Sequence, residues 1–249
     1  MANFRPLKNY LLYLIDQLVE KHGLRGPFLD IGCGRGDISL HFARKGWAGK
    51  AIDPSGEAVA AAKKTLAPHE NKVVVEQGDI FQVEGQYRTL ILCDVLEHVA
   101  NDEELLHTIR RNTFRDPAGS HLIFSAPIFL KEWRWDDRFY GHVRRYEIEE
   151  LLALLRKENF DVLDIWDFTF PLFWLLRRIY TRALPEKKVL GTTSERLSRE
   201  SSLQSSWDMG ALSAVFENGI WWKPVFHLQS RFKKCLKGCE CVLAAKFVG

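Results

Sequence analysis

The chain lacks a long uncharged apolar run, and no segment reaches the roughly 20 residues that a membrane-spanning helix needs. Residues 1–16 also lack the order of basic, apolar and small residues that is typical of a signal peptide. The formal net charge of +3 is too small to indicate nucleic-acid binding by itself, and no DNA partner is expected. These absences favour a globular, cytoplasmic protein.

Cysteine is scarce, and its spacing carries no zinc signature. The chain has five cysteines, an odd number, and no CxxC pair. A closed zinc site needs a fourth ligand and a regular spacing, which Cys235, Cys239 and Cys241 do not provide. We therefore expect reduced thiols, buried or on the surface, and no bound metal.

Two glycine signatures are missing as well: the GxGxxG fingerprint of dinucleotide-binding folds and the GxxxxGK(S/T) phosphate loop. The chain has a GxGxG loop instead, formed by Gly32, Gly34 and Gly36. The loop follows the apolar run 28–31 and precedes a helical segment. Such a strand–loop–helix unit brings bare backbone close to a ligand at the carboxyl end of a sheet, although glycines at this spacing can also form a plain tight turn.

Short apolar runs alternate with helical segments along the chain. Strands are expected at residues 28–31, 50–53, 73–76, 89–93, 121–125, 161–166 and 242–247. Helices are expected at residues 7–21, 37–45, 57–67, 102–112 and 146–159. This order predicts an α/β fold with a doubly wound, seven-stranded, mostly parallel sheet and a helical insert before the last strand.

Acidic residues stand at four successive strand ends: Asp30, Asp53, Asp79 and Asp94. The carboxyl ends of parallel strands share one edge, so these acids would line one ligand crevice. Carboxylates there suit a cationic ligand and would repel a pyrophosphate. An acid after the second strand can accept hydrogen bonds from ribose hydroxyls, although Asp53 taken alone could also be a helix N-cap or a solvated acid.

These segments resemble the class I S-adenosylmethionine (SAM)-dependent methyltransferases. The stretch from Phe28 to Asp37 (FLDIGCGRGD) resembles the first motif of that family, and residues 51–53, 78–80 and 93–99 resemble the next three. Residues 140–146 (YGHVRRY), followed by a helix, resemble a subgroup related to the ubiquinone-biosynthesis-like small-molecule methyltransferases. The resemblance is specific for the Rossmann-like fold and the cofactor, but not for the substrate.

The resemblance implies that the residues at these strand ends bind SAM and its product, S-adenosylhomocysteine. Asp30, Gly32 and Gly34 would line the methionine part of the cofactor. Asp53 would hold the ribose hydroxyls, and Asp79 would accept a hydrogen bond from the adenine amine. The other residues expected at the cofactor are Cys33, Gly36, Pro54, Ile80 and, at the amino end, Cys93 and Asp94.

Methyl transfer from a sulfonium mainly requires alignment, and a hydroxyl or carboxylic acid acceptor can also require a base. His142 is the first candidate for this base because histidine titrates near neutral pH and the surrounding segment is aromatic and basic; His98 is the second. Asp94 and Glu97 leave a metal-dependent catechol-type site open, but they do not suffice to predict one.

Structural roles for the same histidines remain open at this point. His142 could order its loop while Arg144 and Arg145 pair with Asp136 or Asp137. A methyltransferase can also work without any base. His98 could contact the cofactor loop instead of the acceptor.

Residues 168–237 differ from the rest of the chain in charge. They hold 12 basic and 5 acidic residues, a net charge of +7, whereas the remainder carries −4. We expect a SAM-binding core of residues 1–167 and 238–249, and a basic, aromatic insert at 168–237 that contains a mobile loop at 191–206.

A helix at residues 168–184 would separate apolar from basic side chains. Leucines, Ile179 and Tyr180 would share one face, and the opposite face would carry Arg177, Arg178 and Arg182. Such a helix can form a lid over the active site or lie in a membrane interface, and we favour the lid.

The sequence therefore predicts a SAM-dependent methyltransferase that acts on a small or lipid-like acceptor, most readily on oxygen. One alternative is an enzyme that docks a protein or RNA on the basic insert. The run DPPY or NPPY, which marks amino-methylation of nucleic-acid bases in the wider family, is absent after the fourth strand. A catalytically silent SAM-binding module is another alternative, and the intact cofactor motifs count against it. The sequence specifies neither the acceptor nor the oligomeric state.

Overall fold

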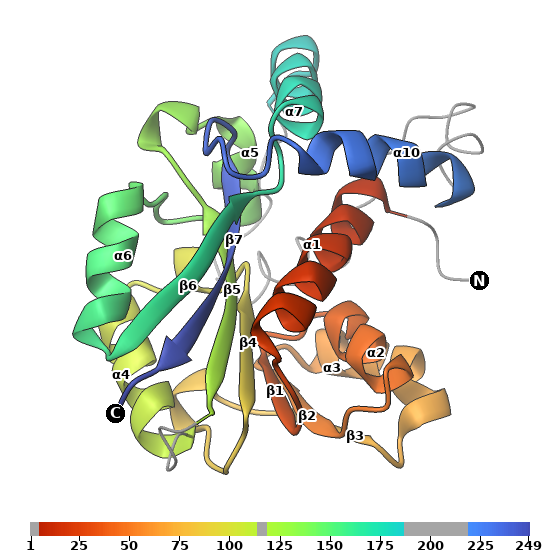
Figure 1. The fold of residues 1–249 in the computed structure, drawn as a ribbon, viewed down its shortest axis with the longest axis vertical. Helices are drawn as coiled ribbons and strands as arrows, with labels where there is room; N and C mark the ends of the chain where they lie inside the picture. Colours follow the sequence, from red (N-terminus) through yellow and green to blue (C-terminus); the bar gives the residue numbers. More distant parts are fainter. Residues whose placement is uncertain (1–4, 114–118, 187–218) are drawn as a thin grey trace.

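A seven-stranded sheet with the order β3-β2-β1-β4-β5-β7-β6 forms the centre of the computed structural model, which describes residues 5–113, 119–186 and 219–249 (Figure 1). The strands are β1 (Phe28–Ile31), β2 (Gly49–Asp53), β3 (Val73–Gln77), β4 (Thr89–Cys93), β5 (His121–Pro127), β6 (Phe160–Asp167) and β7 (Glu240–Phe247). The first five pair in parallel, and β7 runs antiparallel between β5 and β6. The predicted seven-stranded, mostly parallel sheet is confirmed.

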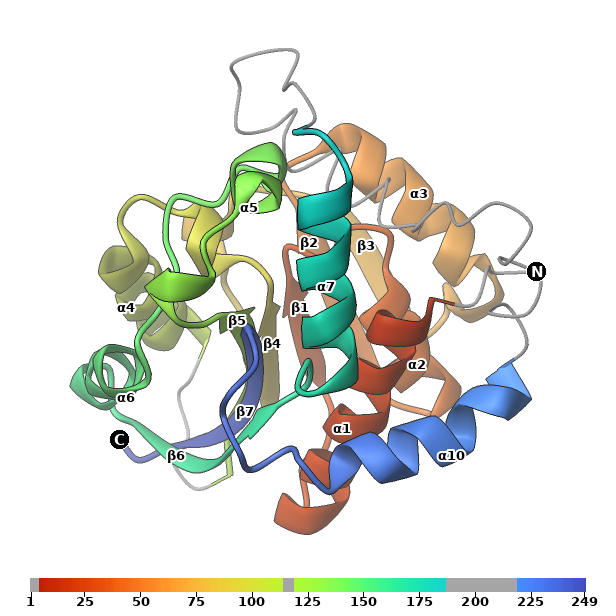
Figure 2. The ribbon, with the colours of Figure 1, turned by 90° about the horizontal axis from the view of Figure 1, so that it is seen from above.

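Helices cover both faces of the sheet. One face packs against α1 (Pro6–His22), α2 (Asp37–Arg44) and α3 (Gly56–Leu66), and the other against α4 (Asp102–Thr113) and α6 (Ile148–Lys157) (Figure 2). Successive side chains of a strand point to opposite faces. In β4, for example, Ile91 packs in the core on the α1 side and Leu92 in the core on the α4 side. Strands that are apolar on both faces are typical of a doubly wound sheet.

The strand order reverses between β1 and β4, which are hydrogen-bonded neighbours. The chain winds outward from β1 to β3 and then returns to β4 to build the other half. Ligands of such sheets bind beyond the carboxyl ends of the strands at this reversal. The short helix α5 (Trp135–Tyr140) and α7 (Leu172–Ala183) lie at the same edge (Figures 1 and 2).

The insert is described at its two ends, by α7 and by α10 (Gly219–Ser230). In α10, Trp222 and Phe226 are buried in the core on the α1 side, and the ring centroids of Tyr10 and Phe226 lie 5.2 Å apart. This end of the insert therefore belongs structurally to the core. The predicted loop at 191–206 lies outside the described residues.

The helix predicted at 168–184 forms from Leu172, after Pro171, and one of its three arginines is buried. Arg177 is only 8% exposed, whereas Leu175 and Ile179 are 50% and 54% exposed. Phe173, however, lies in the core with Leu172 and Leu176 packed against it, and Arg182 is exposed, so neither the predicted apolar face nor the predicted basic face is buried as a whole. None of the helices in the described ranges is long and apolar enough to cross a membrane.

Candidate active site

The glycine loop joins β1 to α2 through backbone that favours glycine. Gly32, Gly34 and Gly36 have φ values of 70°, 53° and 77°. A Cβ atom at Gly32 would lie 2.5 Å from Cγ2 of Val95, in the segment that follows β4. Only glycine meets both constraints, so the loop presents backbone instead of side chains at the carboxyl edge.

Asp53, at the end of β2, ties this loop to the sheet. One carboxylate oxygen accepts a hydrogen bond from the Gly34 amide at 2.9 Å, and the other accepts from the Ser55 amide at 2.9 Å. Each oxygen keeps a lone pair for a further donor. The N-cap of α3 is Ser55, so the N-cap alternative for Asp53 is wrong. Burial raises the pKa of Asp53, and the two amides act in the opposite direction.

Asp30 lies buried in β1 and accepts a hydrogen bond from the Ser39 hydroxyl at 2.6 Å. Burial raises the pKa of Asp30 to about 6, although the Ser39 hydrogen bond opposes the shift. Cys33 and Cys93 are buried nearby, and burial raises the pKa of both thiols. All five cysteines of the chain are free.

The other two acids predicted at strand ends, Asp79 and Asp94, are exposed. One oxygen of Asp79 accepts from the Phe81 amide at 2.9 Å, which leaves the other oxygen open. Asp94 has a φ of 57° and accepts from the Ser125 hydroxyl at 2.6 Å. The structure thus gathers at one edge the loop and the other residues predicted for the cofactor: Pro54, Ile80, Cys93 and the acids.

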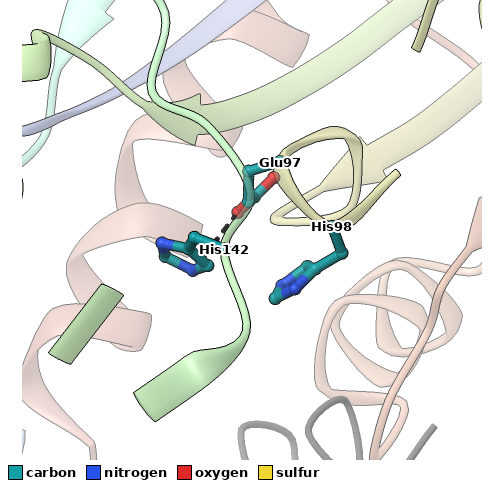
Figure 3. A group of neighbouring side chains, drawn as sticks. All are labelled: Glu97, His98 and His142. Carbon is teal, nitrogen blue, oxygen red and sulfur yellow. Dashed lines mark ion pairs between the residues drawn. The ribbon is translucent and has the colours of Figure 1, made fainter. Parts of the chain in front are cut away.

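Two histidines stand beside this edge, on elements far apart in the sequence. His98 ends the short helix η3 (Leu96–His98), directly after β4, and His142 follows α5. Their ring centroids lie 5.0 Å apart (Figure 3). Burial lowers the pKa of His98 to about 4, and the neighbouring His142 adds to this effect. The structure therefore brings together the two candidate bases.

Asp137 of α5 fixes the ring of His142. One oxygen lies 2.9 Å from Nδ1 of His142 and accepts from Nε of Arg145 at 2.8 Å, and the other accepts from Arg177 at 2.8 Å. Burial opposes ionisation, but the hydrogen bond from His142 and the charges of the two arginines outweigh it and hold the pKa of Asp137 well below its usual range. The carboxylate is therefore ionised wherever the protein is folded near neutral pH.

The predicted pairing of Arg145 with Asp137 is confirmed, and that of Arg144 is wrong. Arg144 donates to Asp102 of α4 at 2.5 Å, and the Tyr146 hydroxyl donates to the same carboxylate at 2.8 Å. Neighbouring residues of this extended segment point to opposite sides, so Arg144 and Arg145 reach different helices.

Comparisons with known proteins match this architecture. The family model described as "Methyltransferase domain" matches residues 3–165. The chain is 39% identical over 148 residues to a ribosomal RNA small subunit methyltransferase C of Alcanivorax borkumensis, covering 53% of this chain and 42% of that protein. It is 30% identical over 117 residues to a ubiquinone biosynthesis O-methyltransferase of Pseudomonas aeruginosa, covering 44% of this chain and 50% of that protein. The chain thus spans about half the length of these relatives.

A similar fold occurs in the geranyl diphosphate C-methyltransferase of Streptomyces coelicolor, whose structure contains Mg2+, geranyl diphosphate and S-adenosylhomocysteine. The TM-score is 0.59 at 15% identity, over 95% of this chain and 78% of that one.

This chain belongs to the class I SAM-dependent methyltransferase family.

One residue of this methyltransferase, Glu97, was considered from its sequence only for a metal-dependent site that was left open. Glu97 is 1% exposed, and its Oε2 has no hydrogen-bond partner in the described part of the chain. Burial, followed by the charge of Asp94, raises the pKa of Glu97 well above its usual value. Glu97 lies with His98 and His142 in a group whose donor atoms are within 4.8 Å of one another. Val95 and Leu96, directly before Glu97, are apolar, and this is the feature of the sequence that could have indicated that Glu97 is buried.

In this methyltransferase, α7 is bound to α5 and its neighbours mainly through the side chain of Arg177. Its guanidinium donates to both oxygens of Asp136 at 2.7 Å and to the backbone carbonyl of Glu132 at 3.0 Å. The indole of Trp135 also donates to the carbonyl of Thr181 in α7 at 2.9 Å. Because Arg177 bonds to Asp137 too, the insert is linked directly to the residue that orients His142.

Proposed function

We propose that this chain transfers the methyl group of SAM to a hydroxyl oxygen of a small or lipid-like acceptor. The observation that carries the proposal is the pair His98 and His142, which lie together after β4 and after α5 with both rings fixed by hydrogen bonds. A neutral hydroxyl is a weak nucleophile and gains from a base that removes its proton, whereas a neutral amine can attack first and lose its proton afterwards. The name of the ubiquinone biosynthesis O-methyltransferase agrees with an oxygen acceptor.

On the cofactor side, the residues fit a cationic nucleoside. The loop offers backbone, Asp53 has free lone pairs on both oxygens, and Asp79 has one free oxygen. We assign the methionine part to Asp30 and the loop, the ribose to Asp53 and the adenine amine to Asp79. The cofactor supplies a methyl group that its sulfonium has already activated, so the protein has mainly to align the acceptor.

On the acceptor side, His142 activates the hydroxyl and Asp137 orients His142. The Nδ1 of His142 faces the ionised Asp137, so Nε2 is the nitrogen that remains for the acceptor. The lid α7 excludes water above this point, because Arg177 holds it on α5. Replacing His142 should therefore slow turnover and leave SAM binding unchanged.

The test is a screen with SAM labelled in its methyl group, across phenols, carboxylic acids, amines and polyprenyl-linked alcohols. We expect label in an oxygen-bearing acceptor, and in His142→Ala a turnover lower by about 100-fold, the usual contribution of a positioned proton acceptor. His107→Ala, which removes a half-exposed histidine of α4, is the matched control. Label only in amines would contradict the oxygen proposal, and normal turnover of His142→Ala would give that residue a structural role.

RNA is the second candidate acceptor, because the relative with 39% identity is a ribosomal RNA methyltransferase and the insert is basic. The same assay with ribosomal RNA decides between them. A label that stays with the RNA after washing, and that is released when the RNA is digested with nuclease, would favour RNA over the small-molecule acceptor.

We also propose that the outer side of α7 meets a membrane surface. The half-exposed Leu175 and Ile179 and the positive charge of the insert support this. Wild-type protein should co-sediment with anionic vesicles more than Leu175→Glu/Ile179→Glu does. Equal sedimentation of the two proteins would leave α7 as a lid alone.

A further inference from the structure

The donor atoms of Glu97, His98 and His142 converge on one point beside the carboxyl edge. One donor atom from each residue lies within 4.8 Å of the others, and Nε2 of His142 is 4.0 Å from Oε1 of Glu97 (Figure 3). In a tetrahedral zinc site, bonds of about 2.1 Å place donors about 3.4 Å apart. Small side-chain movements would therefore close the group around an ion.

The imidazole rings of His98 and His142 are each fixed by a hydrogen bond at Nδ1. Nδ1 of His98 lies 3.2 Å from the carbonyl oxygen of Gly141, and Nδ1 of His142 lies 2.9 Å from the carboxylate of Asp137. A carbonyl and an ionised carboxylate only accept hydrogen bonds, so both Nδ1 atoms donate. Each neutral ring then carries its lone pair on Nε2. Metal-binding histidines nearly always have their second nitrogen fixed in this way.

Glu97 supplies the carboxyl group of the site. Its side chain is 1% exposed and Oε2 has no hydrogen-bond partner among the described residues, although buried polar atoms are generally paired. A bare carboxylate at this depth is costly, and a cation held by the two imidazoles would provide the missing partner.

We propose that Glu97, His98 and His142 bind a divalent transition-metal ion such as Zn2+. Two imidazoles and one carboxylate suit such ions better than Mg2+, which prefers oxygen donors. Three protein ligands leave a coordination position open, as catalytic zinc sites do. This inference rests on the proposed function for its role: the open position takes the acceptor hydroxyl and lowers its pKa.

The reaction balances without a further reagent. The acceptor O–H bond breaks and its proton passes to solvent. The oxygen electron pair forms the new O–CH3 bond, and the pair of the breaking C–S bond stays on sulfur, which becomes a neutral thioether. With the ion bound, the ion takes over the role that the proposed function gives to Nε2 of His142, and His142→Ala then lowers turnover because the ion loses a ligand.

The test measures metal binding without SAM or acceptor, so that its failure differs from failure of the proposed function. Chelator-treated protein is dialysed against Zn2+ and, in parallel, against Co2+, whose visible spectrum distinguishes nitrogen and oxygen ligands from cysteine thiolates. We expect about one ion per chain, no thiolate band, and an affinity reduced at least about tenfold in Glu97→Gln and in His98→Gln. His107→Ala and Cys235→Ser should bind like the wild type, and thermal melts check that each variant is folded.

No stoichiometric binding by the wild type would overturn the proposal. Binding that survives both Glu97→Gln and His98→Gln but is lost in Cys235→Ser would overturn it too, because the ion would then belong to the cysteine cluster. Metal binding without any methyl transfer would instead leave the site standing and contradict the proposed function.

Discussion

A buried carboxylate among the residues proposed for the cofactor destabilises the fold when it ionises. Asp30 is 2% exposed, and the Ser39 hydroxyl is its side-chain hydrogen-bond partner. A group whose folded pKa lies above its unfolded value favours folding while protonated, and this contribution is lost as pH rises through the folded pKa. For Asp30 the window runs from the unfolded value of about 3.9 to about 6.

Asp30→Asn should therefore stabilise the ligand-free protein at neutral pH. The free energy of unfolding of the variant relative to wild type should rise between pH 4 and pH 7, by up to about 3 kcal/mol, because two pKa units correspond to that amount. Urea unfolding at several pH values measures it. The exposed Asp161, at the start of β6, gives the control Asp161→Asn, which should stay within about 0.5 kcal/mol. A difference that does not grow with pH would contradict the buried, ionisable Asp30.

The residues proposed for the cofactor could be named from the sequence because each lies at the end of a recognisable strand and several match a known motif. The side-chain contacts made by Asp137 and Glu97 could be named only in part. Asp137 contacts His142 through a local turn, but its bond to Arg177 joins residues 40 positions apart. Oε2 of Glu97 has no hydrogen-bond partner among the described residues because of how the chain packs around η3. The type of residue alone does not reveal this packing.

At the scale of elements, α7 is held on the site by a buried ion cluster. Arg177 is 8% exposed and makes charge-assisted hydrogen bonds to Asp136 and Asp137. Removal of one partner from a buried cluster leaves an uncompensated charge, which typically costs about 3–5 kcal/mol.

Arg177→Leu should therefore lower the free energy of unfolding by about 3–5 kcal/mol, because two buried aspartates lose a partner. Arg182→Ala, an exposed position of the same helix, should change it by no more than about 0.5 kcal/mol. Chemical denaturation of both variants measures the difference. An equal, small effect of the two would mean that α7 is not anchored through Arg177.

The periodicity of residues 172–184 predicts a two-sided helix but not which side faces the protein. A buried arginine is uncommon, so the apolar side is the usual inward choice. Here Asp136 and Asp137 of α5 bind the buried Arg177, and Leu175 is left half-exposed, while Phe173 of the same helix still packs in the core. Only the assembled site shows this balance.

At the scale of the molecule, the sheet places the residues proposed for the cofactor and those proposed for the acceptor at one edge. The former lie at or just after the ends of strands β1 to β4, and the latter lie in the segments after β4 and after β5. The seven strands were predictable because each is a short apolar run bounded by glycine, proline or polar residues. The antiparallel insertion of β7 between β5 and β6 was not, because pairing between distant segments leaves no local pattern.

The central claim is that this edge binds SAM, and calorimetric titration of the ligand-free protein with SAM tests it most directly. The account predicts saturable binding by the wild type with a dissociation constant of about 1 μM to 1 mM, a range common for enzyme substrates. Asp53→Asn should bind at least about tenfold more weakly, because it loses charge-assisted hydrogen bonds to the ribose, whereas Asp161→Asn should bind normally. No binding by the wild type, or equal affinity in Asp53→Asn, would contradict the account.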